Sequence, residues 1–290
     1  MGKIVGAAFL SHHPGLMQNE EIRRAVGAGV DSDLINGYKK VREKIEALKP
    51  DAVIIFDSHW FTTGFNLLDA NAHSTGNYVS DEMPWYLHGV DYDYRGHPNL
   101  ANAIEEVGIE FGVRTRTTAN KGLPKAYASI NIIKQLHLER MDIPVVSASC
   151  CQNCTWDQFL PAGEVVGEAI RRSNYRVVLI ASGALSHRFN NIEWKQVHPS
   201  IFHESNVSSS ENVASDKVAI RAMEEGRHGD IVSNWETEYK KRNWEAFGGH
   251  YLQMIGAGGG AECTWKGEAM SAYENARGTG NIHIWFDAEG

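Results

Sequence analysis

The sequence has few cysteines, a deficit of basic residues and no long apolar run, and each shortage argues against a class of protein. No apolar stretch approaches the roughly 20 residues of a membrane-spanning helix, so we expect no membrane span. The 28 Lys and Arg residues are outnumbered by 36 Asp and Glu residues, which gives a net charge of −8. Nucleic acid is therefore not expected as a partner, because binding its phosphates needs a basic face.

Only four cysteines are present, and three of them are crowded into the run Cys-Cys-Gln-Asn-Cys at residues 150–154. This is not the disulfide framework of a secreted protein. Cys151 and Cys154 could form a thiol pair or half of a zinc site, but no second pair is present, and we favour inert, reduced cysteines. Residues 1–6 lack the apolar core and cleavage site of a signal peptide. We therefore expect a cytoplasmic protein.

No composition break and no repeat of solenoid length divides the chain, so we expect one domain over residues 1–290. Apolar runs typical of buried strands alternate with stretches of helical periodicity. This alternation predicts an α/β fold, with a central, mostly parallel or mixed sheet flanked by helices. The predicted strands cover residues 4–10, 52–60, 113–117, 143–149, 175–182 and 281–286, and the predicted helices cover 31–48, 99–111, 126–138, 158–172, 216–225, 229–236 and 244–256.

Three segments fit neither pattern. Residues 62–98 are rich in Gly, Pro and aromatic residues and are too long for an idle connection, so we expect short strands and part of a pocket wall there. Residues 197–211 are polar and predict a mobile or ligand-gated loop. The glycine-rich run 256–260 lacks the lysine and the leading strand of a phosphate-binding loop, and we interpret it as a helix end.

Three of the predicted buried strands stop abruptly at a histidine: His12 or His13 after the first, His59 after the second, and His187 after strand 175–182. Ligands of open α/β sheets bind beyond the carboxyl ends of the strands, so these histidines are expected to share one site. Two imidazoles and one carboxylate make the facial triad of non-haem Fe(II) oxygenases. We hypothesise that His59 is one ligand of a catalytic iron. The 36 acidic residues leave the carboxylate open.

The same stretches resemble a known family. Ser11-His12-His13-Pro14, the run Phe-Asp-Ser-His-Trp at residues 56–60 and the run Ala-Ser-Gly-Ala-Leu-Ser-His-Arg-Phe at residues 181–189 are similar to class III extradiol ring-cleavage dioxygenases, the superfamily of the protocatechuate dioxygenase β-subunit. Residues 78–84 and 92–98 are most similar to its homoprotocatechuate (3,4-dihydroxyphenylacetate) branch. The resemblance runs from the first strand to about residue 260 and is looser beyond it.

The resemblance implies a role for individual residues. His12 and His59 match the two histidine ligands of Fe(II), and Glu245 matches a glutamate ligand at the start of a late helix. Mn(II) suits the same ligands. His187 matches an acid/base histidine, and Tyr127 matches a position near the substrate that is histidine in some relatives. The candidates for further contact with the substrate are His13, Lys121, Arg188 and His250.

The implied reaction is cleavage of a catechol ring by O₂ beside its two hydroxyl groups, which yields a ring-opened semialdehyde. The implied substrate is 3,4-dihydroxyphenylacetate, and the implied assembly is a homodimer or a larger homo-oligomer. Other readings stay open: another catechol, 2-aminophenol, a zinc-dependent hydrolase, or a non-enzymatic metal-binding protein of the same fold. Asp57 is expected either to orient a ligand histidine or to cap the turn that follows it.

Overall fold

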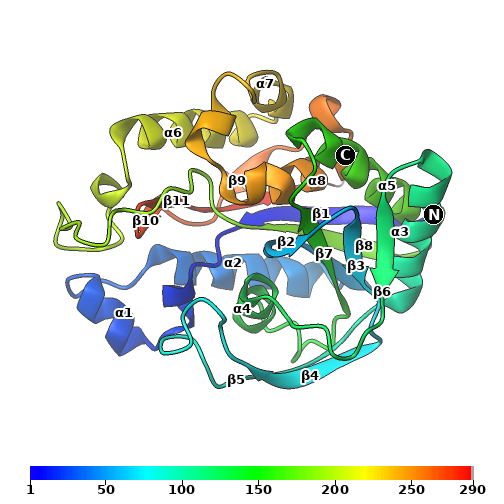
Figure 1. Ribbon diagram of the computed structural model, residues 1–290, viewed down its shortest axis with the longest axis horizontal. Coiled ribbons are helices and arrows are strands. Elements are labelled where there is room, and N and C mark those ends of the chain that lie inside the picture. Colours follow the sequence, from blue (N-terminus) through cyan, green and yellow to red (C-terminus); the bar gives the residue numbers. More distant parts are fainter. Residues whose placement is uncertain (289–290) are drawn as a thin grey trace.

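An eight-stranded mixed sheet runs through the middle of the molecule in the computed structural model, which describes residues 1–288 (Figure 1). The strand order is β6-β3-β7-β2-β8-β1-β12-β9, and helices cover both faces, so the predicted α/β class is confirmed. The strands are β1 (Lys3–Leu10), β2 (Ala52–Thr62), β3 (Asn66–Asp69), β4 (His73–Tyr78), β5 (Val90–Arg95), β6 (Thr115–Thr118), β7 (Val145–Cys151), β8 (Arg176–Ser182), β9 (Gly267–Ala269), β10 (Glu274–Ala276), β11 (Thr279–Asn281) and β12 (His283–Phe286). The α-helices are α1 (Glu20–Val26), α2 (Asp33–Leu48), α3 (Pro98–Phe111), α4 (Tyr127–Gln135), α5 (Phe159–Arg172), α6 (Ser210–Glu224), α7 (His228–Ser233) and α8 (Gly249–Ala257).

The four central strands, β7, β2, β8 and β1, are parallel to one another. Their apolar residues are almost completely buried, as expected for strands covered on both faces. Because parallel strands point the same way, the residues that follow β1, β2 and β8 emerge at one edge of the sheet. This edge receives the three histidine-bearing segments that the sequence predicts to share a site.

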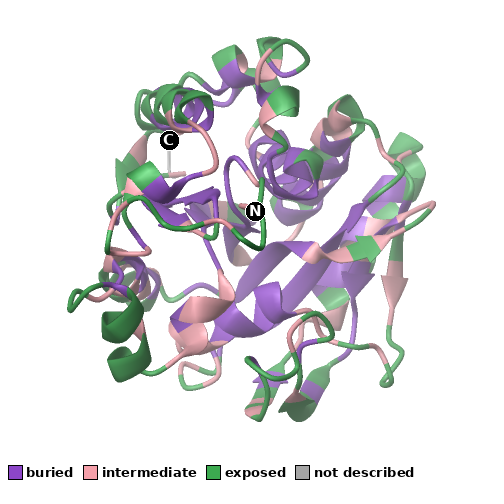
Figure 2. Cartoon of the chain, turned by 60° about the vertical axis from the view of Figure 1, so that its left-hand side comes forward, coloured by how far each residue is buried: buried purple, intermediate pink, exposed green. Residues whose placement is uncertain are grey.

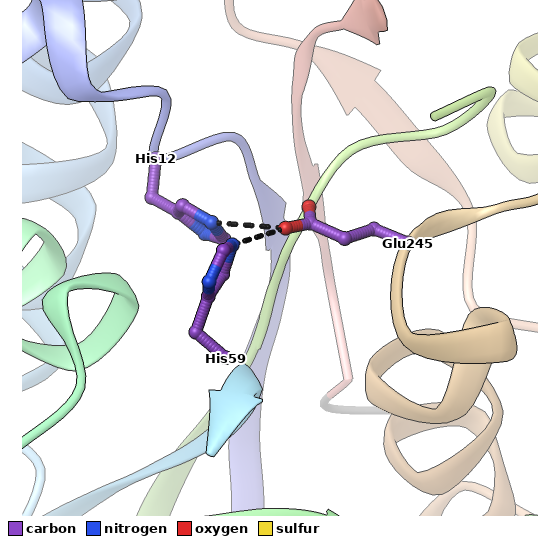
Figure 3. A group of neighbouring side chains, drawn as sticks. All are labelled: His12, His59 and Glu245. Carbon is purple, nitrogen blue, oxygen red and sulfur yellow. Dashed lines mark ion pairs between the residues drawn. The ribbon is translucent and has the colours of Figure 1, made fainter. Parts of the chain in front are cut away.

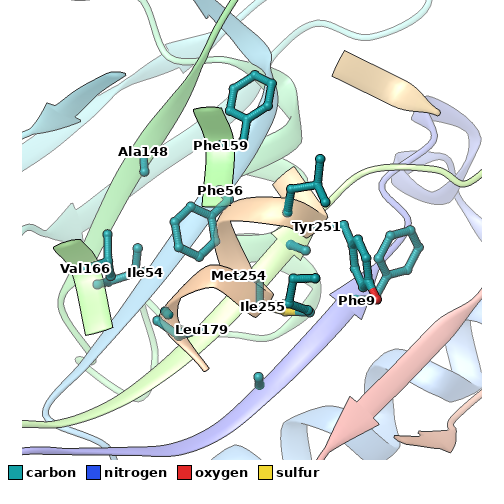
Figure 4. Packing of buried hydrophobic residues seen from close by; sticks show 14 of the residues in the cluster. Phe9, Ile54, Phe56, Ala148, Phe159, Val166, Leu179, Tyr251, Met254 and Ile255 are labelled. Carbon is teal, nitrogen blue, oxygen red and sulfur yellow. The ribbon is translucent and has the colours of Figure 1, made fainter. Parts of the chain in front are cut away.

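The two faces of the sheet pack against different helices. Ile54 and Phe56 of β2 belong to a core with α3, α5 and α8, whereas Val53 and Ile55 belong to a core with α2 and α4. This alternation follows from the two-residue period of a strand. Figure 4 shows the first of these cores, in which Phe56 lies among side chains of α5 and α8. Figure 2 shows the buried strands at the centre of the molecule. The site at the strand ends therefore stands on a sheet that is fixed from both sides.

Two predicted helices begin elsewhere than expected, and both lie near the site. Predicted helix 244–256 begins only at Gly249, because Ala246, Phe247 and Gly248 have φ angles of +48°, +58° and +73°. Residues in the left-handed region cannot continue a right-handed helix. Predicted helix 216–225 begins earlier, at Ser210, because the Ser209 hydroxyl accepts a hydrogen bond from the Asn212 amide and caps the helix.

The irregular segment 62–98 forms short strands, as predicted. Strands β4 and β5 pair as a separate antiparallel hairpin, which lies near α4 (Figure 1).

Helix α1 lies in a stretch for which no element is predicted, and its first turn is capped by Asn19. All four cysteines are free, and Cys150 and Cys151 are buried. Within residues 1–288 we find no helix that combines the length and the apolar character needed to cross a membrane.

The fold predicts a specific loss of stability in acid. His283 of β12 is fully buried, with its Nδ1 accepting a hydrogen bond from the Ser11 amide. Burial lowers the pKa of His283 to about 3, from an ordinary value of 6.5. Between these values the unfolded chain binds a proton that the native protein excludes, so stability is lost as the pH falls below about 6.5. At pH 4.5 the loss from this residue is roughly 2 to 3 kcal/mol.

Urea unfolding at pH 7.5 and pH 4.5 measures this loss. The free energy of unfolding of the His283→Gln variant is expected to fall less than that of the wild type between the two pH values. His88→Gln alters an exposed loop histidine and should follow the wild-type dependence. An equal loss for His283→Gln and wild type would contradict the assignment.

Candidate metal centre

His12 follows β1 and is held on both its backbone and its ring. Its carbonyl oxygen accepts a hydrogen bond of 2.6 Å from the Asn131 side chain, and its Nδ1 lies 2.8 Å from the Ser182 hydroxyl. The Ser182 hydroxyl donates its proton to the Ala128 carbonyl oxygen at 3.2 Å, so it accepts from His12 Nδ1–H. His12 Nε2 is thereby left with a free lone pair, which is the state in which histidine binds a metal.

His59 lies in an irregularity of β2 that breaks the register of the strand. Asp57 pairs with Ser149 and Phe61 with Cys150, so residues 58–60 loop out of the pairing with β7. The Asp57 carboxylate accepts hydrogen bonds from the amides of His59 and Trp60 at 2.8 and 3.0 Å. Its other oxygen accepts from the amide and the hydroxyl of Ser129 in α4. Of the two roles expected for Asp57, the structure shows the cap, which fixes the backbone of His59.

Glu245 is held by the short turn that precedes α8. One carboxylate oxygen, Oε2, accepts a hydrogen bond of 2.6 Å from the Ala184 amide in the loop after β8. The next two residues, Ala246 and Phe247, are left-handed without being glycine, which costs of the order of 1 kcal/mol or more for each. This strained turn directs Glu245 Oε1, which is buried and has no hydrogen-bond partner, toward the histidines.

These three side chains converge on one point, as Figure 3 shows. Glu245 Oε1 lies 2.7 Å from His59 Nε2 and 3.3 Å from His12 Nε2, and one ligand atom from each residue falls within 4.8 Å of the others. Two imidazole nitrogens and one carboxylate oxygen are the donors that a facial-triad metal site requires. The buried, unpaired Oε1 is the atom that a cation would satisfy. The residues therefore fit a divalent metal ion.

Electrostatics at this point favour a charge-separated cluster. Burial opposes the charge of His59, but the neighbouring carboxylates of Glu245 and Glu82 outweigh it and raise the pKa of His59 to about 10. Burial also opposes the charge of Glu245, but the neighbouring His12 and His187 outweigh it and hold the pKa of Glu245 well below its ordinary value. The carboxylate is thus negative and attracts positive charge, which either a proton on an imidazole or a metal ion provides.

His187 and Tyr127 lie beside the three converging residues. A single β-bridge between Ser186 and Trp244 brings the loop after β8 against the turn that carries Glu245, and His187 Nε2 lies 3.7 Å from Glu245 Oε1. The Tyr127 hydroxyl, at the start of α4, lies 2.8 Å from His59 Nε2. Burial and the charge of Glu245 raise the pKa of Tyr127 well above its ordinary value, so its hydroxyl stays protonated.

A cavity of about 520 Å³ opens above the converging side chains. His12, Glu245, His187 and Tyr127 line one part of it. Most of the remaining wall is apolar or aromatic, and it includes residues from the irregular segments 62–98 and 197–211: Met83, Trp85, Tyr86, Ile201 and Phe202. The pocket wall predicted for residues 62–98 is therefore present. Whether residues 197–211 move stays a prediction, although Asn206 binds the backbone of this loop at several points.

The four other predicted substrate contacts are placed differently from one another. His13 lines the cavity. Lys121 and Arg188 are exposed on loops and do not line it. His250 is fully buried under the loop after β8, where a Cβ atom at Gly183 would lie 2.5 Å from its ring, and it does not reach the cavity wall. Of the four, the structure brings only His13 to the cavity.

Three polar residues near the site are not found by the sequence reasoning. Glu82 Oε1 lies 3.4 Å from His59 Nδ1 and can orient that ring. Asp216 of α6 accepts hydrogen bonds from the amide and the hydroxyl of Ser186, next to His187. Arg277, in the turn between β10 and β11, lines the cavity. Of the three, only Glu82 lies in a stretch that carries the family resemblance, residues 78–84. That resemblance is the sequence feature by which Glu82 could have been predicted.

Comparisons with known proteins agree with this geometry. The family model for the catalytic LigB subunit of aromatic ring-opening dioxygenase matches residues 6–287. The chain is 29% identical over 192 residues to 3,4-dihydroxyphenylacetate 2,3-dioxygenase from Escherichia coli, a match that covers 65% of this chain and 68% of that enzyme. It is 30% identical over 196 residues to the 2-aminophenol 1,6-dioxygenase beta subunit from a Pseudomonas species, covering 64% of this chain and 63% of that subunit.

A solved structure extends the likeness to the whole fold. The crystal structure of an uncharacterized protein from Escherichia coli K12 superposes with a TM-score of 0.64 at 17% identity, covering 97% of this chain and 99% of that chain. At this identity the likeness concerns the fold alone. The family model spans almost every residue from β1 to β12 and includes all three converging side chains. The chain belongs to the LigB family of aromatic ring-opening dioxygenases.

Proposed function

We propose that this protein is a non-haem Fe(II) dioxygenase that opens the ring of a catechol beside its two hydroxyl groups. The observation that carries the proposal is the convergence of His12, His59 and Glu245 beside a cavity that His12 and Glu245 line, in a chain of the LigB family. The first candidate substrate is 3,4-dihydroxyphenylacetate, the compound in the name of the Escherichia coli relative. The second is 2-aminophenol, which is named in the Pseudomonas relative of similar identity.

In this proposal the two histidines and the glutamate hold the metal. Fe(II), when bound, supplies a template for catechol and O₂ and a path for electrons between them. Mn(II) suits the same donors. The protein contributes the fixed orientation of each donor: Ser182 sets the tautomer of His12, Asp57 fixes the backbone of His59, and the Ala184 amide holds the second oxygen of Glu245.

His187 is the proposed acid and base. Its Nε2 faces the same cavity as Glu245 Oε1, and it does not belong to the group of three metal-binding side chains. A histidine there can accept the proton of a catechol hydroxyl as the substrate binds and return it to an oxygen atom of the product. Tyr127, with its hydroxyl protonated, donates a hydrogen bond to substrate oxygen. The largely apolar walls keep competing water away from the reacting groups.

Removal of the carboxylate charge tests the metal site. The Glu245→Gln variant is expected to bind Fe(II) with at least tenfold lower affinity than the wild type, and so to retain less iron. Even loss of a residue that only hydrogen-bonds to a metal ligand lowers the metal affinity roughly 10- to 100-fold. Metal analysis after anaerobic reconstitution with Fe(II) measures this. The matched control is Glu262→Gln, which alters an exposed glutamate outside the cavity and should keep full iron content.

The same preparations separate the alternative functions. O₂ uptake is measured with 3,4-dihydroxyphenylacetate, unsubstituted catechol and 2-aminophenol. Full iron content in Glu245→Gln would remove Glu245 from the site. Iron binding by the wild type without O₂ uptake on any of these substrates would exclude the proposed dioxygenase on them and favour a hydrolase or a non-enzymatic metal-binding protein.

Replacement of the proposed acid and base tests the chemistry. The His187→Phe variant is expected to keep its iron and to lose roughly 10²- to 10⁴-fold in kcat, the usual contribution of a positioned proton donor and acceptor. His73→Phe, at an exposed position of β4, is the control and should turn over like the wild type. An unchanged kcat in His187→Phe would show that this histidine carries no proton in the rate-limiting step.

A further inference from the structure

Arg277 is the single Lys or Arg side chain among the described residues that line the cavity. The charged carboxyl groups in the same lining are Glu82 and Glu245, and both face imidazoles of the metal centre. Most of the wall elsewhere is apolar or aromatic. The cavity thus has a metal-binding part with two carboxylates and, separately, one permanent positive charge.

The turn that carries Arg277 is fixed to the rest of the protein. Arg277 (φ +56°) and Gly278 (φ +101°) connect β10 to β11. The Asn275 side chain accepts from the Gly278 amide at 2.8 Å, and the carbonyl oxygens of Arg277 and Gly278 accept from the amides of Asn190 and Ser208. A Cβ atom at residue 278 would lie 2.6 Å from the Arg188 carbonyl oxygen, so the packing requires glycine. The backbone of Arg277 is therefore held in place.

The guanidinium of Arg277 is unpaired within the described part of the chain. No ion pair or side-chain hydrogen bond to it is found among residues 1–288, whereas Arg172, for example, binds both Glu110 and Glu168. Its charge does act on Tyr86 in the cavity wall: burial raises the pKa of Tyr86, and Arg277 partly offsets the rise. An unpaired guanidinium beside a largely apolar cavity is suited to a planar anionic group on a ligand.

His13, next to His12 in the chain, also lines the cavity. An imidazole, unlike a guanidinium, carries no permanent charge, so His13 is a weaker candidate for binding an anion. Lys121 and Arg188 lie outside the cavity wall. Among residues 1–288, Arg277 alone combines a permanent positive charge with a place in the cavity wall.

We propose that Arg277 binds a carboxylate on the side chain of the substrate and selects catechols that carry such an acid over neutral catechols and aminophenols. This inference rests on the proposed function, because it assumes that the ring oxygens lie at the metal centre. The guanidinium forms two parallel N–H···O bonds to the carboxylate, which fix the far end of the substrate. Of the substrates named in the two relatives, 3,4-dihydroxyphenylacetate carries this group and 2-aminophenol does not.

The test compares an acid with its neutral isostere. Steady-state kinetics of the iron-loaded protein are measured with 3,4-dihydroxyphenylacetate and with 3,4-dihydroxyphenylacetamide. In Arg277→Met, kcat/KM for the acid is expected to fall roughly 10- to 100-fold, mainly through KM, with little change for the amide, because only the charged hydrogen bonds are lost. Arg277→Lys should retain part of the preference. Arg221→Met removes an equal charge from an exposed position of α6 outside the cavity and is the control.

A binding measurement separates this inference from the proposed function. Calorimetry of the metal-free protein with phenylacetate and phenylacetamide reports the carboxylate contact without any turnover, and thermal melting confirms that each variant is folded. If no catechol is cleaved but phenylacetate binds the wild type more tightly than Arg277→Met, the dioxygenase proposal fails and the anion site stands. If catechols are cleaved and Arg277→Met keeps the wild-type preference for the acid, the assignment of Arg277 is overturned.

Discussion

The site depends on one buried carboxylate oxygen, Glu245 Oε1, that has no hydrogen-bond donor of its own. A negative charge in such a place is costly unless positive charge lies against it. The imidazoles of His12, His59 and His187 face this oxygen at 2.7 to 3.7 Å. His12 follows β1, His59 lies in the irregular last part of β2, and His187 follows β8, so the need to neutralise one atom ties these three parallel strands to the turn before α8.

The same requirement explains why the surrounding backbone is irregular. Strand β2 gives up three residues of its pairing with β7 to place His59, and the turn after Glu245 accepts two left-handed residues that are not glycine. Such conformations persist only where the rest of the structure enforces them. Here the enforcement comes from hydrogen bonds to Asp57 on one side and from the bridge between Ser186 and Trp244 on the other.

Local sequence patterns could predict the sheet and the histidines, because buried strands and their abrupt ends are encoded in consecutive residues. The strands ending near His12, His59 and His187 were all expected from such runs. Glu245 could be selected only through the family resemblance, since nothing in the local pattern marks one glutamate among 36 acidic residues. The false helix start at residue 244 has the same origin: Ala246 and Phe247 have no preference for left-handed backbone, and only tertiary contacts impose it.

Arg277 marks a different limit of prediction. It lies in a turn between two three-residue strands, beyond the part of the chain where the family resemblance is specific. Its approach to the cavity results from contacts with residues about 70 to 90 positions earlier in the chain, at Ser208 and Asn190. The spacing of residues along the chain does not indicate a contact between segments so far apart. Lys121 and Arg188, which stand in recognisable loops, were the more visible choices, and the fold places both at the exterior.

The irregularity in β2 also bears on how such a protein can change over time. Asp57 is paired with Ser149 before residues 58–60 leave the sheet, and Phe61 is paired with Cys150 after they return. Replacements among residues 58–60 can therefore alter the surroundings of the metal centre without shifting the pairing on either side. In such a sheet, residues near the reacting groups can be substituted separately from the buried residues that hold the strands together. New chemistry can then arise at the sheet edge while packing still constrains the core sequence.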